Sequence, residues 1–187
     1  MKNLFWSVYL NLEDELIDLG KTIYLTDESQ QLSVYSMRIA DLLVRTVIEI
    51  EALSKELYKQ LGGDMHPRKA DGTERCLEFD RDCLKLLDDK WLISKKVVHT
   101  SGDIFHFVNP ENFTRIPIPL SVIMKGKGWN RAYQAVKHDR YNNLQRGSIN
   151  SFINSLAALY LLNLYYADVD YPENVFDPRL VKTKIML

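Results

Sequence analysis

The sequence predicts a mainly α-helical protein that folds as one domain over residues 1–187. Apolar residues recur at helical spacing in three long segments, 4–20, 29–61 and 149–167. The chain is long enough to bury a substantial core, and its 46% hydrophobic and 26% charged content is typical of a globular protein. Residues 64–128 separate the two helical halves, and we interpret them as an insertion within the same domain.

Charge, hydropathy and cysteine content narrow the class of protein. The formal net charge is -1 at pH 7, so any nucleic-acid site must be a local patch. The closest approach to a membrane span, residues 156–166, is shorter than the roughly 20 apolar residues that a span needs, so no membrane association is expected. On a helix Cys76 and Cys83 would lie about 10 Å apart, too far for a disulfide. Two reduced cysteines indicate a cytoplasmic protein.

The first half of the chain contains two predicted helices. The first covers residues 4–20, and Gly20 favours its termination. The second covers residues 29–61, with Ser29 as its cap and the pair Gly62-Gly63 at its end. At about 1.5 Å per residue this helix would be roughly 50 Å long. Its apolar stripe consists of Leu32, Tyr35, Ile39, Leu42, Leu43, Ile50, Leu53 and Leu57.

Four charged residues follow one edge of the second helix at spacings of three or four: Arg38, Asp41, Arg45 and Glu49. Such spacing is typical of a solvated ladder of ion pairs on the helix surface. The alternative is that some of these residues flank an active site.

The insertion is predicted to contain a loop, a helix and a hairpin. Its loop covers residues 64–73, and its helix covers 74–90 with Cys76 and Cys83 facing inward. Two β-rich runs within residues 91–108 flank a glycine-containing turn and predict a short β-hairpin. Prolines further along keep the rest of the insertion extended.

The second half of the chain is predicted to hold two helices and a tail. The helices cover residues 129–140 and 149–167, with a bend between them. Trp129 lies where the preceding loop meets the first of these helices and can anchor it. The C-terminal tail, 169–187, has prolines and no clear period.

Positive charge is concentrated between Lys125 and Arg146. This segment holds six Lys or Arg residues and a single acid, Asp139. A local excess of this kind attracts a phosphate backbone. A solvated basic segment without a ligand would have the same composition.

Within this segment, Arg131 and His138 form the candidate catalytic pair. Seven residues are close to two helical turns, so both side chains project from one face. Tyr133 and Val136 point to a different, buried face. Imidazole transfers protons near neutral pH, and a guanidinium stabilises negative charge on a phosphate. The pair is therefore suited to acting on a phosphodiester.

The run W-x3-Y-x2-V-K-H-D-R, from Trp129 to Arg140, resembles the motif helix of HEPN proteins (higher eukaryotes and prokaryotes nucleotide-binding domain). Their signature is an arginine, four to six residues and a histidine, and six residues separate Arg131 from His138. Residues 36–58 are similar to the long second helix of bacterial HEPN-like proteins, and residues 149–166 to their closing helix. The resemblance covers the helical halves and not the insertion.

The resemblance implies a HEPN-like antiparallel helical bundle that forms a homodimer, with the two Arg/His stripes meeting at a shared cleft. It also implies a metal-independent RNA endonuclease of the toxin–antitoxin or phage-defence type, which needs no cofactor. RNA would be the substrate, and a cognate antitoxin or regulatory protein a further partner. His138 would take or relay the proton of the ribose 2′-hydroxyl, and Arg131 would stabilise charge on the scissile phosphate.

Several neighbouring side chains are expected to bind the substrate, namely Lys127, Asn130, Lys137, Arg140 and Asn142. Pairing with the long helix and orienting His138 are two alternative roles for Lys137, Asp139 and Arg140, besides binding phosphate. The remaining histidines, His66, His99 and His106, lack the spacing of a zinc site, so no metal is expected. Three C-terminal tyrosines are expected to pack or to face a partner, with stacking on bases as the alternative: Tyr160, Tyr165 and Tyr166.

Two other functions stay open. Ala132 follows Arg131 at a position that is often polar in the family, so the first alternative is an inactive HEPN-like module that binds a nucleotide, RNA or a protein. The second is a structural helical protein whose basic segment docks an acidic partner.

Overall fold

The computed structural model describes residues 3–26, 29–98, 104–106, 120 and 128–166. The mainly α-helical class is confirmed, and no strand forms within these ranges. The helices are α1 (Leu4–Gly20), α2 (Ser29–Leu32), α3 (Met37–Gln60), α4 (Leu84–Trp91), α5 (Trp129–His138), α6 (Arg140–Asn143) and α7 (Ile149–Tyr165). A π-helical turn, η1 (Phe79–Cys83), precedes α4, and two 3₁₀ turns follow α4 and α6, namely η2 (Ile93–Lys95) and η5 (Leu144–Arg146).

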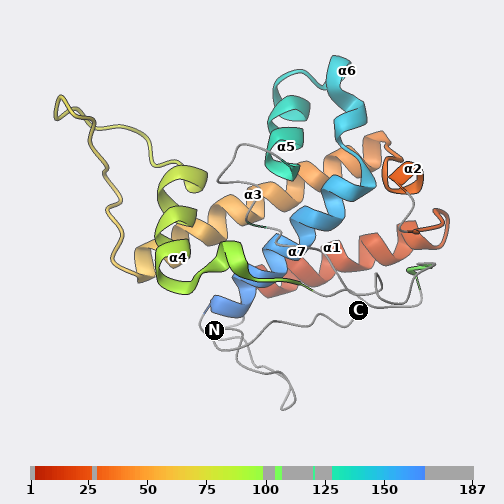
Figure 1. The fold of residues 1–187 in the computed structure, drawn as a ribbon, viewed down its shortest axis with the longest axis horizontal. Coiled ribbons are helices and arrows are strands. Elements are labelled where there is room, and N and C mark those ends of the chain that lie inside the picture. Colours follow the sequence, from red (N-terminus) through yellow and green to blue (C-terminus); the bar gives the residue numbers. More distant parts are fainter. Residues whose placement is uncertain (1–2, 27–28, 99–103, 107–119, 121–127, 167–187) are drawn as a thin grey trace, which may run out of the picture.

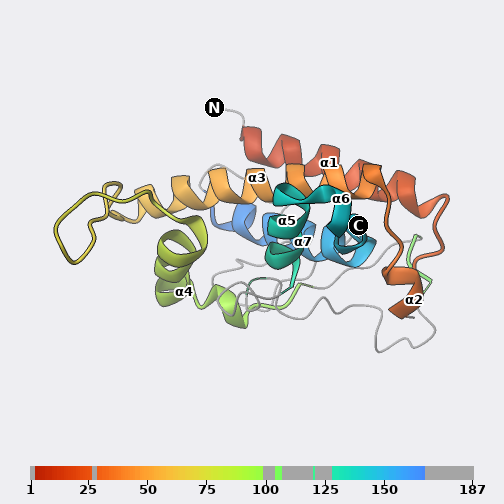
Figure 2. The ribbon, with the colours of Figure 1, turned by 90° about the horizontal axis from the view of Figure 1, so that it is seen from above.

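Helices α1, α3 and α7 form the body of a helical bundle (Figure 1, Figure 2). α7 packs most extensively against α3 and also contacts α1. The chain direction of α1 is opposite to that of α3, whereas α7 runs in the same direction as α3 (Figure 1). The HEPN-like arrangement of the bundle that the resemblance implied is not confirmed. α5 packs across α3 and α7, and α4 lies near the far end of α3.

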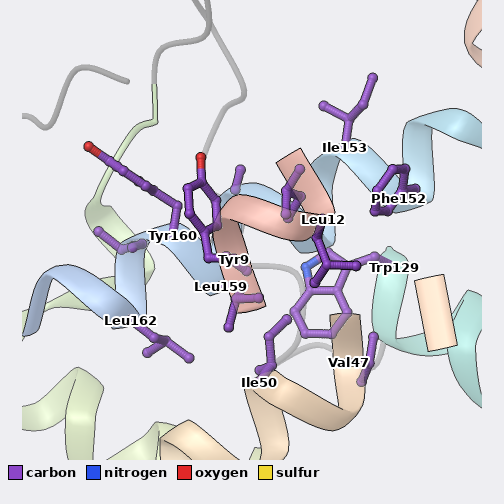
Figure 3. Packing of buried hydrophobic residues seen from close by; sticks show 14 of the residues in the cluster. Tyr9, Leu12, Val47, Ile50, Trp129, Phe152, Ile153, Leu159, Tyr160 and Leu162 are labelled. Carbon is purple, nitrogen blue, oxygen red and sulfur yellow. The ribbon is translucent and has the colours of Figure 1, made fainter. Parts of the chain in front are cut away.

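The core is centred on α7, which is buried along almost its whole length. Phe152 and Leu159 of this helix are fully buried, and they face Leu12 of α1 and Ile50 of α3 (Figure 3). The indole of Trp129 enters the same cluster from α5 (Figure 3). A helix that is apolar on all sides is stable only when other elements cover it, so α7 forms the centre around which α1, α3 and α5 assemble.

The single helix predicted over residues 29–61 is wrong, because the chain breaks between α2 and α3. Tyr35 forms an antiparallel bridge with Ser148, and the Val34 carbonyl accepts a hydrogen bond of 2.9 Å from the Ile149 amide. These contacts hold the backbone extended just before α3. Ser36 then caps α3, since its side chain accepts a hydrogen bond of 3.1 Å from the Ile39 amide.

The helix predicted over residues 74–90 begins later than expected. The Arg75 guanidinium forms two hydrogen bonds with the Asp82 carboxylate. This carboxylate also accepts a hydrogen bond of 2.9 Å from the Glu78 backbone amide. These bonds fix an extended approach to η1. Cys76 is consequently exposed, while burial raises the pKa of the Cys83 thiol to about 12. The two cysteines therefore do not share a helix face.

The remaining predictions concern three helices, the β-hairpin and the absence of a membrane span. The helices predicted at 4–20, 129–140 and 149–167 are confirmed as α1, α5 and α7, with ends that shift by at most two residues. The hairpin is not confirmed; its turn and residues 107 and 108 lie outside the described residues, as does the tail. Phe105 instead forms an isolated parallel bridge with Leu25. Within the part of the chain that is described, no helix is both long and apolar enough to cross a membrane.

Helix α1 carries a carboxyl group whose ionisation opposes folding. The Tyr9 hydroxyl, buried beside Trp6 and Tyr160, donates a hydrogen bond to Glu13. Burial raises the pKa of Glu13, the Tyr9 hydrogen bond opposes this shift, and the neighbouring Asp14 adds to it. The folded chain thus binds this proton more tightly than the unfolded chain does. The resulting stabilisation is complete below the unfolded pKa of about 4.3 and is lost as pH rises through the higher folded pKa.

We expect Glu13→Gln to be more stable than the wild type at pH 7 and equal to it near pH 4. Glutamine keeps an oxygen acceptor for Tyr9 but carries no charge to desolvate. Urea midpoints at several pH values between 4 and 7 measure the difference. Asp18→Asn is the control of opposite sign, because Arg38 lowers the pKa of Asp18, and this variant should lose stability at pH 7. A Glu13→Gln difference that does not change with pH would contradict the assignment.

Candidate functional site

Helix α5 has one face in the core and one in solvent. Gly128, with a φ of 70°, turns the chain into the helix. Trp129 is 1% exposed, and Tyr133 and Val136 continue the buried face at helical spacing. The anchoring role predicted for Trp129 is consistent with this burial. Packing against α3 and α7 fixes which face of α5 remains open to solvent.

Arg131 and His138 both lie on the exposed face of α5. They are seven residues apart in one continuous helix, so their Cα atoms are about 10 Å apart along the axis and about 20° apart around it. Neither side chain has a hydrogen bond or ion pair with any residue that the structure describes. Both groups are therefore available to an external ligand on that side.

Lys137 is exposed and contacts Tyr133 within α5. Its ammonium lies 5.1 Å from the centre of the Tyr133 ring. The pKa of Lys137 is raised, first by its hydrogen bond to the Tyr133 hydroxyl and also by the charge of Glu51. Burial raises the pKa of Tyr133 itself. The ring contact lies within α5, and no ion pair between Lys137 and α3 forms among the described residues.

Asn130 lies on the buried side of α5, away from Arg131 and His138. It is 4% exposed, and its Nδ2 lies 3.4 Å from a carboxylate oxygen of Asp80 in η1. Its Oδ1 is buried and has no hydrogen-bond partner in the part of the chain that the structure describes. The expectation that Asn130 binds substrate beside Arg131 and His138 is therefore at odds with its position. Successive helical residues differ by about 100° in direction, which separates it from Arg131.

Arg140 and Asn142 stabilise the turn that follows α5. Arg140 donates a 2.6 Å hydrogen bond to Asp41 of α3, which corresponds to its alternative role of pairing with the long helix. Asn142 donates to the Asp139 carboxylate through its backbone amide at 3.3 Å and its side-chain amide at 2.9 Å. Lys127 lies outside the described residues.

Two residues of the charged edge of α3, Arg38 and Asp41, form ion pairs with other helices. Arg38 reaches across to α1, where one of its nitrogens lies 2.7 Å from Glu15 and 2.6 Å from Asp18. Asp41 pairs with Arg140 as described above. These two residues connect α1, α3 and α6, so they position the elements around α5 and do not line its exposed face.

The remaining candidate residues are the other histidines and the C-terminal tyrosines. Among the described residues, no group of three or more His, Cys, Asp or Glu side chains could hold a metal ion. His66 pairs with Glu74 at 2.8 Å, His106 stacks on Tyr24, and His99 lies outside the described residues. Tyr160 and Tyr165 are each 8% exposed and pack in the core, as their packing alternative expected.

Sequence reasoning missed one residue next to this site. Tyr141 is 95% exposed on α6, three residues beyond His138. The sequence pattern that could have identified Tyr141 is a lone aromatic residue among polar ones, between Arg140 and Asn142-Asn143. No helical or strand periodicity requires an apolar residue at this position. The contacts of Asp80 and Glu51 with α5 depend on long-range packing and had no such signal.

Comparison with models of protein families, with curated proteins and with solved structures finds no match. The resemblance to HEPN proteins therefore rests on the residues quoted above and stays a prediction.

Proposed function

We propose that this protein is a HEPN-like, metal-independent RNA endonuclease that acts as a homodimer in the cytoplasm, in a toxin or phage-defence context. The observation that carries the proposal is the exposure of Arg131 and His138 on one face of α5, with no partner among the described residues. An imidazole and a guanidinium so placed can serve one phosphodiester as base and electrostatic stabiliser.

The proposed reaction is an internal transesterification of RNA. His138 accepts the proton of a ribose 2′-hydroxyl, and the 2′-oxygen attacks the adjacent phosphorus. Arg131 stabilises the negative charge that develops on the phosphate oxygens. The bond to the 5′-oxygen breaks, and this oxygen takes up a proton. The products are a 2′,3′-cyclic phosphate and a 5′-hydroxyl.

The supporting electrostatics are local. Arg131, Lys137 and Arg146 are exposed on α5 and η5 in a chain whose formal net charge is -1. Such a patch attracts a polyanion without making the whole surface basic. Lys137 would contribute its charge while bound to Tyr133, whereas Asn130 and Arg140 would act by holding α5 and α6 in place.

The test is cleavage of end-labelled single-stranded RNA by the wild-type protein in excess EDTA, with analysis of the product ends. Cyclic phosphate and 5′-hydroxyl ends are expected. Cleavage that requires a divalent cation, or that leaves 5′-phosphate ends, would contradict the proposed chemistry.

An inactive HEPN-like module that binds a nucleotide, RNA or a protein partner is the second candidate, and the position of Ala132 favours it. Ala132 is 7% exposed and faces the core, so no third polar group accompanies Arg131 at the next position. RNA binding that weakens with salt, without any cleavage, would support this module over the nuclease.

A further inference from the structure

Tyr141 is placed unlike the other tyrosines of the described chain. Helix α5 and the segment α6–η5 form a helical hairpin that projects from the body, and α6 lies at its tip (Figure 1). Tyr141, on α6, is 95% exposed, whereas five other tyrosines are buried: Tyr9, Tyr58, Tyr133, Tyr160 and Tyr165. Of the other exposed ones, Tyr24 stacks on His106 at 4.5 Å between ring centres.

The backbone around Tyr141 is held on both sides. On one side, Arg140 is tied to Asp41 of α3 at 2.6 Å. On the other, Asn142 and Asn143 donate side-chain hydrogen bonds of 2.9 Å to the carboxylate and the carbonyl of Asp139. The ring therefore projects into solvent from an ordered turn. A ligand that stacks on it would meet a preorganised support and would lose little affinity to ordering the chain.

The α5–η5 hairpin that carries the ring also carries several exposed cations. Exposed Arg131 and Lys137 precede the ring on α5, and exposed Arg146 follows it on η5. The single acid of the hairpin, Asp139, is occupied by its hydrogen bonds to Asn142. An exposed aromatic ring on the same hairpin as several cations complements a ligand that has a flat base and an anionic backbone, and this combination is typical of single-stranded nucleic-acid sites.

We propose that Tyr141 is a stacking platform for an unpaired base of single-stranded RNA whose phosphates follow the cations of the α5–η5 hairpin. This inference rests on the proposed function and identifies its substrate as single-stranded instead of duplex RNA. In a duplex the bases are stacked on each other and their faces are not accessible to a tyrosine ring.

The test is binding of a fluorescent oligoadenosine of about 12 nucleotides, a length within the range that such sites cover. Its riboses are 2′-O-methylated, so the proposed reaction cannot consume it and binding is measured apart from cleavage. We expect Tyr141→Ala to weaken binding about 5- to 150-fold, the range that loss of one stacked base produces. Tyr141→Phe should bind like the wild type, because it keeps the ring.

Two controls separate stacking from charge. On an abasic oligomer of the same length, Tyr141→Ala should bind like the wild type, since no base is present to stack. Between about 50 and 200 mM salt, Tyr141→Ala should keep the wild-type slope of log affinity against log salt, whereas Arg146→Ala should reduce it by about 0.7. Tyr24→Ala, an exposed tyrosine outside the hairpin, is the matched variant that should change nothing.

Three results would each contradict the stacking role of Tyr141 for a different reason. Equal oligoadenosine binding by Tyr141→Ala and wild type would overturn the stacking role, while the cleavage assay would still decide the nuclease independently. Equal losses in Tyr141→Ala and Tyr141→Phe would assign the effect to the hydroxyl and overturn stacking. A change of oligomeric state in Tyr141→Ala, with RNA binding unaltered, would assign the ring to a protein contact instead.

Discussion

Replacing Trp129 by alanine is expected to lower the free energy of unfolding by about 3–5 kcal/mol, the usual cost of truncating a large buried aromatic side chain. Trp129 is 1% exposed, and its indole lies beside Val47 and Ile50 of α3 (Figure 3). Since domains are typically stable by about 5–15 kcal/mol, this loss is a large share of the total. Urea denaturation followed by circular dichroism measures it.

Two further variants make this prediction specific to the position. Trp129→Phe keeps an aromatic ring in the cluster and should cost much less. Trp91→Ala removes a half-buried indole that stacks on Tyr165 at 4.6 Å, outside α5, and should also cost less than Trp129→Ala. If Trp91→Ala were the more destabilising variant, Trp129 would not be the main anchor of α5.

The helices that could be predicted from the sequence are those whose pattern is local. In α1 and α7 the apolar residues alone define the segment, and Asn3 and Ser148 cap these helices through bonds to the amides of Trp6 and Ser151. The start of α3 was mispredicted because Tyr35 pairs with Ser148, more than a hundred residues away. Periodicity within a window cannot include a backbone contact of this range.

In the candidate site, too, the features set by local helix geometry were predictable and those set by long-range packing were not. Helical spacing correctly placed Arg131 and His138 on one exposed face, since the angle between them depends only on helix geometry. It could not reveal that Asn130 is buried against Asp80, or that Arg140 pairs with Asp41. These contacts depend on how η1 and α3 pack around α5, which the sequence of α5 does not contain.

His138→Ala is expected to lower the rate of RNA cleavage in EDTA by about 10²- to 10⁴-fold, the usual contribution of a positioned general base. The variant should fold like the wild type, because His138 is exposed at the end of α5 and has no described partner. Its affinity for the 2′-O-methylated oligomer should change little, since an imidazole that acts as a base is neutral. The comparison of rate with affinity separates chemistry from binding.

The matched control is His66→Ala, which removes another exposed histidine, one that pairs with Glu74 in the loop after α3. We expect it to cleave like the wild type. Arg131→Ala should lower the rate, and Arg131→Lys should restore part of it by keeping a positive charge, though not the paired donors of a guanidinium. If His138→Ala and His66→Ala both cleave as fast as the wild type, the exposed face of α5 is not the nuclease site. If only His138→Ala loses cleavage while binding persists, the imidazole acts in the chemical step itself.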